Sequence, residues 1–409
     1  MRARRATSPS PEERQEKLAR LRNLKMARSA HAYVRGNTLQ FYDWLNDAAV
    51  RDLPQGPSVW ICGDCHTGNL GPVADTRGRV EIQIRDLDQT VIGNPAHDLI
   101  RLALSLATAA RGSDLPGLTT VHMLEALADG YESAFSRATK KSVASDRPAS
   151  VQLILKTALR RSWKQLAKER IEDLRPTLPL GSRFWPLAPE EERELRDLFG
   201  QAEMMSLATS LRGRDDDGRV TMLDAAYWVK GCSSLGRLRY AVLLDVDGGT
   251  VTGDDLCFMD LKEAAKAAAP GYADAATPRD NAERIATGAL NLSPALGGRM
   301  RAARLRGRSV VVRELLPQDL KLDVDRLAQE EARLVSRYLG TVVGRAHARQ
   351  MDAAQRRGWS AELRRRRSKT IEAPLWLWSS VMELLACHEV AYLEHCRRYA
   401  TAMQGGKGK

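Results

Sequence analysis

The sequence predicts an α+β fold with two lobes and a large share of helix. Strand-like runs gather in two places, near residues 59–85 and between 238 and 315. Segments such as 95–211, 326–350 and 371–402 instead repeat apolar residues at helical spacing. The expected order is therefore a hairpin followed by helices, then a small sheet with one helix, then helices again.

We divide the chain into four parts on this basis. Residues 1–57 are expected to form N-terminal helices that pack on the larger lobe, with a break near Gly36. Residues 58–215 form a helical lobe that begins with the hairpin, and the polar segment 211–218 marks its end. Residues 216–325 form a small β-rich lobe, and residues 326–409 complete the larger one.

Composition indicates a globular protein with a sizeable core. The chain has 409 residues, of which 43% are hydrophobic and 28% are charged. No apolar run approaches the roughly 18 residues that a membrane helix needs. The N-terminus is basic and polar with no apolar segment after it, and the six cysteines form no disulfide framework. We therefore expect a cytoplasmic protein without a membrane partner.

The net charge of +12 suits nucleic acid, nucleotides or other acidic partners. A solvated basic surface is the simpler interpretation. Aromatic residues are only 5% of the chain and do not alternate with basic ones as in a base-stacking surface. Nucleic-acid binding therefore stays as an alternative rather than as the main prediction.

The first candidate site surrounds the predicted hairpin at 70–85. Asp64 and Asn69 precede the hairpin and Asp86 follows it, so pairing of the strands brings the three side chains together. Two carboxylates and an amide oxygen suit Mg²⁺, and a metal beside a positioned carboxylate suits phosphoryl transfer. The alternative is an Asx-rich loop that caps its own turns.

A second candidate site lies in the β-rich lobe. The segment VKGCSSLG at 229–236 is a glycine-rich turn beside a strand, and Gly231, Ser234 and Gly236 could place backbone N–H groups on phosphates. It is not a Walker loop, and a plain turn is the alternative. Lys262 ends a mostly apolar strand and suits a phosphate contact, with Glu283 on the following helix as its expected partner.

These elements together match the requirements of a kinase-like site: a glycine loop, a strand lysine, a helix glutamate, a base and two metal ligands. Their order is unusual because the hairpin with Asp64 comes first and the glycine loop comes later. The sequence therefore predicts a two-lobed, protein-kinase-like fold with circularly permuted order, which is tolerable where the joined ends lie on the surface.

The stretch Cys62-Gly63-Asp64-Cys65-His66 also spells C-x-x-C-H, which can indicate haem attachment, a redox dithiol or half a zinc site. Haem attachment needs an exported context and an axial ligand, and neither is identifiable. Zinc needs further ligands, for which only the pairs at 387–388 and 395–396 are available. We interpret the pattern as accidental, with Cys65 as a spacer and His66 as a loop support.

Six motifs resemble an uncharacterised bacterial family known as domain of unknown function 2252. They are KMARSAHAYVRG, CGDCHTGNLG, IRDLDQTVIGNPAHDLIRLALSL, KGCSSLGRLRY, LKEA and GRAHAR, in this order between about residues 20 and 400. The family itself is similar to the protein-kinase-like superfamily, in particular to aminoglycoside and choline phosphotransferases. Two departures stand out, since Cys62 replaces a histidine and Ser233 replaces a glycine of the usual pattern.

The resemblance implies roles for individual residues. Asp64 matches the catalytic base, Asn69 and Asp86 match the metal ligands, and Lys262 matches the lysine that contacts the nucleotide phosphates. Structural support is expected from other polar residues of these motifs: His66, Asp88, Asp98, Arg101, His347 and Arg35. Arg35 could instead bind substrate or phosphate, and an inter-helix ion pair is its other interpretation.

The expected function is ATP- and Mg²⁺-dependent transfer of a phosphoryl group to a hydroxyl of a small molecule or protein. One alternative is a non-catalytic nucleotide-binding scaffold that keeps the fold, motivated by Ser233 and the poor match at Glu283. Another is nucleotidyl transfer, which the same residues could support with ATP reversed. A basic nucleic-acid-associated protein is the third alternative.

Overall fold

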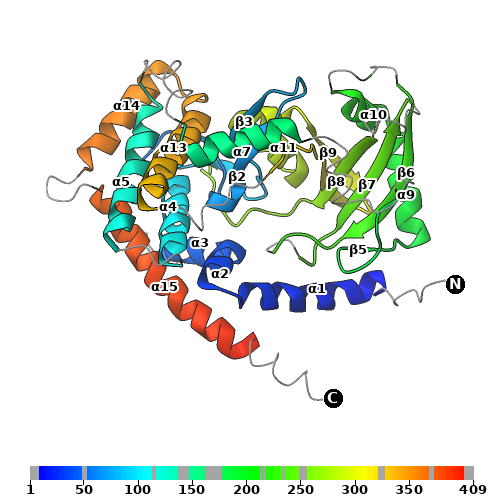
Figure 1. The fold of residues 1–409 in the computed structure, drawn as a ribbon, viewed down its shortest axis with the longest axis horizontal. Helices are drawn as coiled ribbons and strands as arrows, with labels where there is room; N and C mark the ends of the chain where they lie inside the picture. Colours follow the sequence, from blue (N-terminus) through cyan, green and yellow to red (C-terminus); the bar gives the residue numbers. More distant parts are fainter. Residues whose placement is uncertain are drawn as a thin grey trace.

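The computed structural model describes residues 9–47, 53–112, 117–136, 147–161, 177–211, 214, 218–232, 235–247, 256–320, 328–367 and 373–399. It has a mixed α/β fold with a helical part at one end and an antiparallel sheet at the other (Figure 1). A short hairpin lies between them, and a long N-terminal helix runs from the helical part toward the sheet.

The helical part forms the larger core. Helices α5 and α13 cross closely because glycines line their contact: a Cβ at Gly130 would lie 1.9 Å from the carbonyl oxygen of Arg337, and one at Gly340 would lie 2.2 Å from that of Leu127. Helix α4 is buried along almost its whole length. The helices of this part are α4 (Pro95–Arg111), α5 (Gly117–Ser133), α13 (Gln329–Ala348), α14 (Ala353–Arg365) and α15 (Leu375–Tyr399).

The predicted hairpin is present as β2 (Leu70–Ala74) and β3 (Val80–Ile84), which pair antiparallel. Asp75 closes its turn, where Gly78 has a φ of 77°. A second antiparallel pair, β1 (Val59–Ile61) with β4 (Val91–Gly93), flanks the loop before the hairpin, and the 3₁₀ turn η1 (Thr67–Asn69) ends that loop. Helix α7 (Ala149–Arg160) contacts the hairpin.

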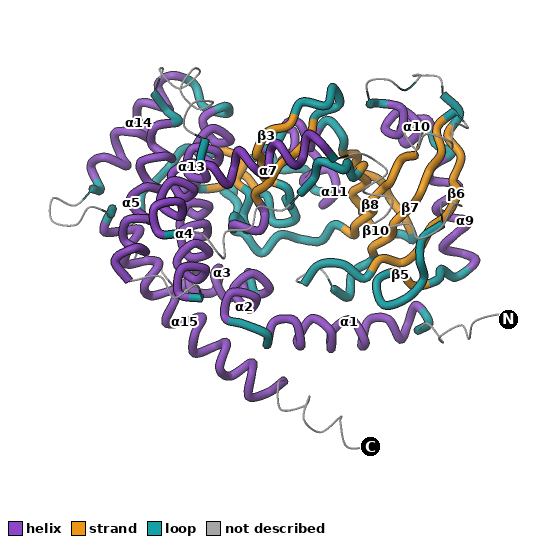
Figure 2. The backbone as a smooth tube through the Cα atoms, in the orientation of Figure 1, coloured by secondary structure: helices purple, strands orange, loops and turns teal. Residues whose placement is uncertain are grey.

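The sheet at the other end has the strand order β5-β6-β7-β8-β10-β9, and every pair in it is antiparallel (Figure 2). The strands predicted from 238, 256 and 309 are confirmed, whereas β5, β6 and β9 were not predicted. The strands are β5 (Phe184–Trp185), β6 (Val220–Trp228), β7 (Arg239–Val246), β8 (Leu256–Glu263), β9 (Met300–Leu305) and β10 (Arg308–Glu314).

Alternate side chains give each face of the sheet its own core. Val242 and Leu244 point into the core that contains α9 (Pro189–Phe199) and α10 (Ala202–Thr209), whereas Ala241 and Leu243 point to the opposite one. The division at 215 assigned these two helices to the helical lobe, but their apolar residues pack with the sheet.

The N-terminal segment forms three helices rather than the expected two: α1 (Pro11–Met26), α2 (Ala30–Gly36) and α3 (Thr38–Asp47). The additional start comes from Ser29, whose side chain accepts the N–H of Ala32 as an N-cap. Helix α1 reaches the sheet, where Leu18 is buried in its core and Arg14 pairs with Glu191 at 2.8 Å. Helix α1 thus also packs against the sheet, a contact that the sequence did not predict.

Two helices connect β8 to β9, namely α11 (Asn281–Leu292), as predicted for 279–292, and α12 (Pro294–Gly297). Helix α11 contacts both the sheet and β1, so it joins the two ends of the molecule. Within the described residues, no helix is long and apolar enough to cross a membrane.

Candidate functional site

The loop between β1 and η1 has a tightly constrained backbone. Gly63 adopts a φ of 74°, and a Cβ there would lie 2.1 Å from the carbonyl oxygen of Gln89. The backbone N–H groups of Cys62 and Gly63 donate to the two carboxylate oxygens of Asp98 at 2.7 and 2.9 Å. Only glycine fits at 63, so the next residue, Asp64, is presented in one defined position.

A buried chain of polar side chains stands behind Asp98. His347 Nε2 lies 3.2 Å from Asp98, and the Tyr131 hydroxyl lies 2.9 Å from His347 Nδ1. The indole of Trp359 donates to the same hydroxyl at 3.2 Å. Asp98 and His347 thus lie where the sequence predicted supporting residues, and Tyr131 and Trp359 extend the chain.

Asp64 is held on both carboxylate oxygens. Arg101 Nε donates to Oδ1 and the Thr38 hydroxyl donates to Oδ2, each at 2.9 Å. Arg101 is fully buried and also donates to the Val34 carbonyl. Burial raises the pKa of Asp64, although Arg101 and Thr38 act to lower it, and the net shift is upward. The arrangement orients one carboxylate that is nearly buried but still 12% exposed.

The hairpin brings Asn69 and Asp86 toward Asp64. Asn69 Nδ2 donates to the Asp64 carbonyl at 2.9 Å, and the Arg85 N–H donates to the Asn69 carbonyl at 2.7 Å. Asp86 is close enough to Asp64 to act on its pKa. His66 precedes η1 and is buried, and its pKa lies well below the ordinary value because of burial and the nearby charges of Arg35 and Arg101.

Lys262 reaches this hairpin from the sheet. Its Nζ lies 3.3 Å from both carboxylate oxygens of Asp86 and contacts Asp88 as well. Burial works to raise the pKa of Asp86, but Lys262 and Arg313 hold that pKa well below its usual range. Burial and the neighbouring Asp86 raise the pKa of Asp88. Asp88, expected as a supporting residue, therefore lies in the site itself.

The Asp86 side chain is 46% exposed, whereas that of Lys262 is 13% exposed. Both line a cavity of about 20 Å³, roughly the space of one water molecule. Asp86 therefore offers its carboxylate to solvent, whereas the Lys262 amine is largely enclosed.

A buried charge network behind Lys262 was not predicted. Arg239 binds Asp260 through two hydrogen bonds of 2.9 and 2.6 Å, and Arg313 donates to Asp260 and to the Arg85 carbonyl. These cations hold the pKa of Asp260 far below its usual range despite burial. The available signal was a charged residue inside the apolar strand Leu256–Leu261.

The expected ion pair between Lys262 and Glu283 is not formed, which corrects that prediction. Glu283 is exposed in the first turn of α11, where Asp280 caps its N–H. The buried neighbour Arg284 faces the hairpin instead and donates to the carbonyls of Asp88 and Ala265 at 3.0 and 2.8 Å. The helix register thus turns an arginine rather than a glutamate toward the site.

The glycine-rich connection between β6 and β7 lies beside α1 and α2. Gly231 and Gly236 have positive φ values of 94° and 102°. Lys25 Nζ donates to the Gly231 carbonyl at 3.0 Å. Ser234, a predicted nucleotide contact, lies outside the described residues, as does Ser233.

Arg35 forms no inter-helix ion pair with the described residues, so that interpretation is set aside. Its guanidinium lies against Gly68, where a Cβ would be 2.3 Å from Nη2. Its Nε is buried without a hydrogen-bond partner. Arg35 therefore borders the 64–69 loop without an ion partner among the described residues.

The C-x-x-C pair lies behind the same loop. The donor atoms of Cys62, Cys65 and Asp98 all lie within 4.8 Å of one another. Zinc sites that are structural usually use four ligands, and Asp98 already accepts two backbone N–H groups. A hydrogen bond with Cys65 and burial raise the pKa of the Cys62 thiol well above its ordinary value. We interpret this cluster as part of the loop support.

A family model covers this site and nearly the whole chain. It is described as an uncharacterised protein conserved in bacteria (DUF2252), and it matches residues 14–398. The chain belongs to this family. The match includes Asp64, Asn69, Asp86 and Lys262, so the whole candidate site lies within the DUF2252 region. No curated protein and no solved structure matches the chain.

Proposed function

We propose that this DUF2252 protein transfers a phosphoryl group from ATP, with Mg²⁺, to a hydroxyl of an acceptor. The observation that carries the proposal is the contact of Lys262 with Asp86 and Asp88, beside Asn69 and Asp64. A phosphate-binding lysine, metal-binding carboxylates and a positioned acidic side chain are the parts that phosphoryl transfer requires.

The order of elements around Lys262 supports a kinase-like fold with permuted order. Strand β6, a turn with two positive-φ glycines, strand β7 and then β8 follow one another, and Lys262 stands on this third strand. Protein kinases place a glycine-rich loop over the phosphates and the lysine on their third strand. The exposed Glu283 departs from that pattern.

The side chains at the hairpin suit Mg²⁺ and a nucleotide. Asn69, Asp86 and Asp88 offer only oxygen ligands, which Mg²⁺ prefers, and Mg²⁺ sites commonly combine one or two carboxylates with substrate phosphates. When bound, Mg²⁺ and ATP supply the phosphoryl group and neutralise its developing charge.

The chain's own residues then have distinct tasks. Lys262 releases Asp86 and Asp88 and pairs with phosphate oxygens instead. Asp64 orients the acceptor hydroxyl and takes its proton as the hydroxyl oxygen bonds to phosphorus and ADP leaves. Its raised pKa makes the carboxylate a better proton acceptor than a free aspartate.

Calorimetric titration of ATP with Mg²⁺ tests the proposal. We expect saturable, Mg²⁺-dependent binding to the wild type that weakens about tenfold or more in Asp86→Ala, a loss of ~1.4 kcal/mol. Glu283→Ala is the matched control and should bind ATP like the wild type, because Glu283 makes no contact with Lys262. The proposal is wrong if the wild type binds no ATP or if Asp86→Ala binds it equally well.

A non-catalytic nucleotide-binding protein is the second candidate. It is favoured by the ion pair between Asp64 and the fully buried Arg101, which engages the proposed base. ATP hydrolysis with water as the acceptor separates the two. An enzyme loses turnover in Asp64→Asn while it still binds ATP, whereas a scaffold shows no turnover in the wild type despite binding.

A further inference from the structure

The N-terminal helices carry a run of uncompensated positive charge. No aspartate or glutamate occurs between Glu16 and Asp43, whereas this stretch contains six lysines and arginines: Lys17, Arg20, Arg22, Lys25, Arg28 and Arg35. The stretch spans most of α1 and all of α2. Its net charge therefore exceeds anything that intrahelical pairing could offset.

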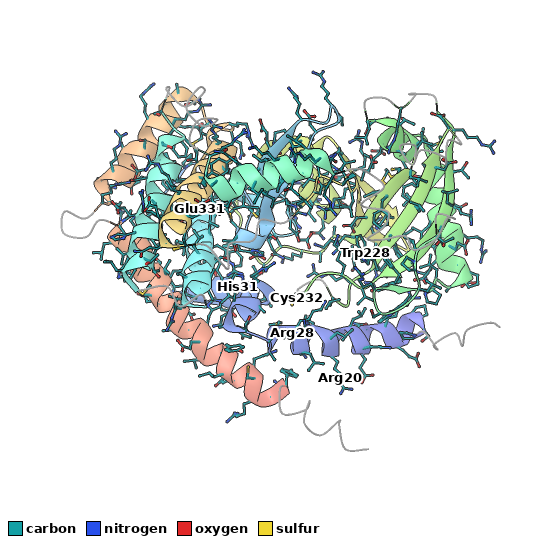
Figure 3. All side chains as sticks on the ribbon, viewed as in Figure 1. Arg20, Arg28, His31, Trp228, Cys232 and Glu331 are labelled. Atoms are coloured by element: carbon teal, nitrogen blue, oxygen red, sulfur yellow. The ribbon has the colours of Figure 1, made fainter. Side chains whose placement is uncertain are left out.

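Four of these cations lie close enough to Cys232 to act on its thiol. A Cβ at Gly36 would lie 3.1 Å from the Cys232 sulfur, so the β6–β7 connection touches the end of α2. Burial raises the pKa of the Cys232 thiol, and four cations close to it act in the opposite direction: Lys25, Arg35, Arg22 and Arg28. We call these four residues the basic cluster. Figure 3 labels Arg28 just after α1 and Cys232 in the connection above it.

The described part of the chain supplies little to balance this charge. Lys25 donates to the Gly231 carbonyl, and Arg22, Arg28 and Arg35 make no ion pair with any residue that the structure describes. Converging like charges repel and destabilise the fold unless an anion binds between them. By contrast, the arginines behind Lys262 are paired with Asp260.

The basic cluster adjoins the 64–69 loop. Arg35 lies against Gly68. Burial lowers the pKa of His66 most, and the charge of Arg35 lowers it further. Asp64 and Asn69 flank these two positions in the chain. An anion held by the cluster would therefore lie on the side of Asp64 where an acceptor must approach, whereas Lys262 stands with Asp86 and Asp88 on the hairpin side.

We propose that the basic cluster binds a phosphate group of the acceptor, so that the substrate carries both a phosphate and a free hydroxyl. The inference rests on the proposed phosphoryl transfer, because it assigns the acceptor side of the same site. Several cations suit a doubly charged phosphate, and arginine donors match its oxygens in pairs.

Equilibrium dialysis with radiolabelled inorganic phosphate, in buffer containing EDTA, tests the cluster without Mg²⁺. We expect saturable binding to the wild type that weakens at least about fivefold in Arg35→Gln and in Arg28→Gln. Arg20→Gln is the matched control: Arg20 lies on α1 with Arg22 and Lys25, is exposed and is not among the cations that act on Cys232, so binding should change less than about twofold. Absent binding, or equal binding in Arg35→Gln, overturns the inference.

ATP titrations on the same variants separate this inference from the proposed function. We expect Arg35→Gln to keep Mg²⁺-dependent ATP binding and Asp86→Ala to keep phosphate binding. If Arg35→Gln loses both ligands and ATP competes with phosphate, the cluster serves the nucleotide and the inference is wrong while the proposed function stands. If duplex DNA binds and Arg20→Gln weakens it as much as Arg35→Gln does, the surface binds nucleic acid and the inference is also wrong. Phosphate binding by a wild type that binds no ATP would overturn the proposed function, and with it the assignment of this phosphate to an acceptor, while the anion site itself would stand.

Discussion

The loop from Cys62 to Asn69 and the connection from Val229 to Leu238 both adjoin Arg35, but they are held in different ways. The first is fastened through its backbone by Asp98, by the Tyr42 hydroxyl on the Gly63 carbonyl and by Asn69. The second has two positive-φ glycines, and a Cβ at Gly236 would meet no atom within 4 Å.

This difference separates two tasks within one site. Residues that carry out chemistry must be held in a fixed geometry, which the buried side chains behind the 62–69 loop provide. A segment that covers a ligand needs space, and a Cβ at Gly236 would meet no atom within 4 Å. Arg101 pairs with Asp64 behind the 62–69 loop, whereas Arg35 makes no ion pair with any residue that the structure describes.

The sharpest contrast is between two arginines. Arg101→Gln should lower the free energy of unfolding by about 3 kcal/mol, because it leaves the nearly buried Asp64 without its ion partner. Arg35→Gln should change it by less than about 0.5 kcal/mol, since Arg35 has no partner to lose within the described part of the chain. Urea unfolding of both variants measures the difference. Equal losses of unfolding free energy in the two variants would contradict the contrast between Arg101 and Arg35.

Two glycines provide the next test. Alanine at a left-handed position costs about 1–2 kcal/mol through its backbone conformation alone, and this cost applies to both Gly63→Ala and Gly236→Ala. Gly63→Ala should lose about 2 kcal/mol more, because its Cβ would meet the Gln89 carbonyl at 2.1 Å. Thermal unfolding compares the two, and a Gly236→Ala variant that is the less stable would refute the fixed-loop account.

Acidification should lower the free energy of unfolding, because the fold buries neutral histidines. Burial lowers the pKa of His66 well below its ordinary value and lowers the pKa values of His97 and His388 to about 4. The unfolded chain takes up these protons near pH 6.5 while the folded chain does not, so stability falls as pH drops below that value. Each histidine should remove about 1.4 kcal/mol per pH unit between about pH 6 and 5.

Urea unfolding at pH 7, 6 and 5 measures this slope, and His388→Gln should reduce it by one histidine's share. A fold that grows more stable on acidification, or a slope that His388→Gln leaves unchanged, would contradict the role of the buried imidazoles.

Local patterns predicted much of this architecture. The alternation at Val80, Ile82 and Ile84 gave the hairpin, and the motif around Asp98 gave the residue that supports the loop. Glu283 was misjudged because one residue of helix register decides whether a glutamate or Arg284 faces the site. The network of Arg239, Asp260 and Arg313 was missed because its three members lie on three different strands, and only strand pairing brings them together.

The central claim is that metal and nucleotide bind together at the hairpin. Mn²⁺ in place of Mg²⁺ tests it directly, since electron paramagnetic resonance reports the bound ion. We predict that ATP raises the affinity of the wild type for Mn²⁺, and that Asn69→Ala and Asp86→Ala lose this gain while Cys62→Ser keeps it. An affinity for Mn²⁺ that ATP does not change, or a gain that depends on Cys62 rather than on Asn69 and Asp86, would contradict the account.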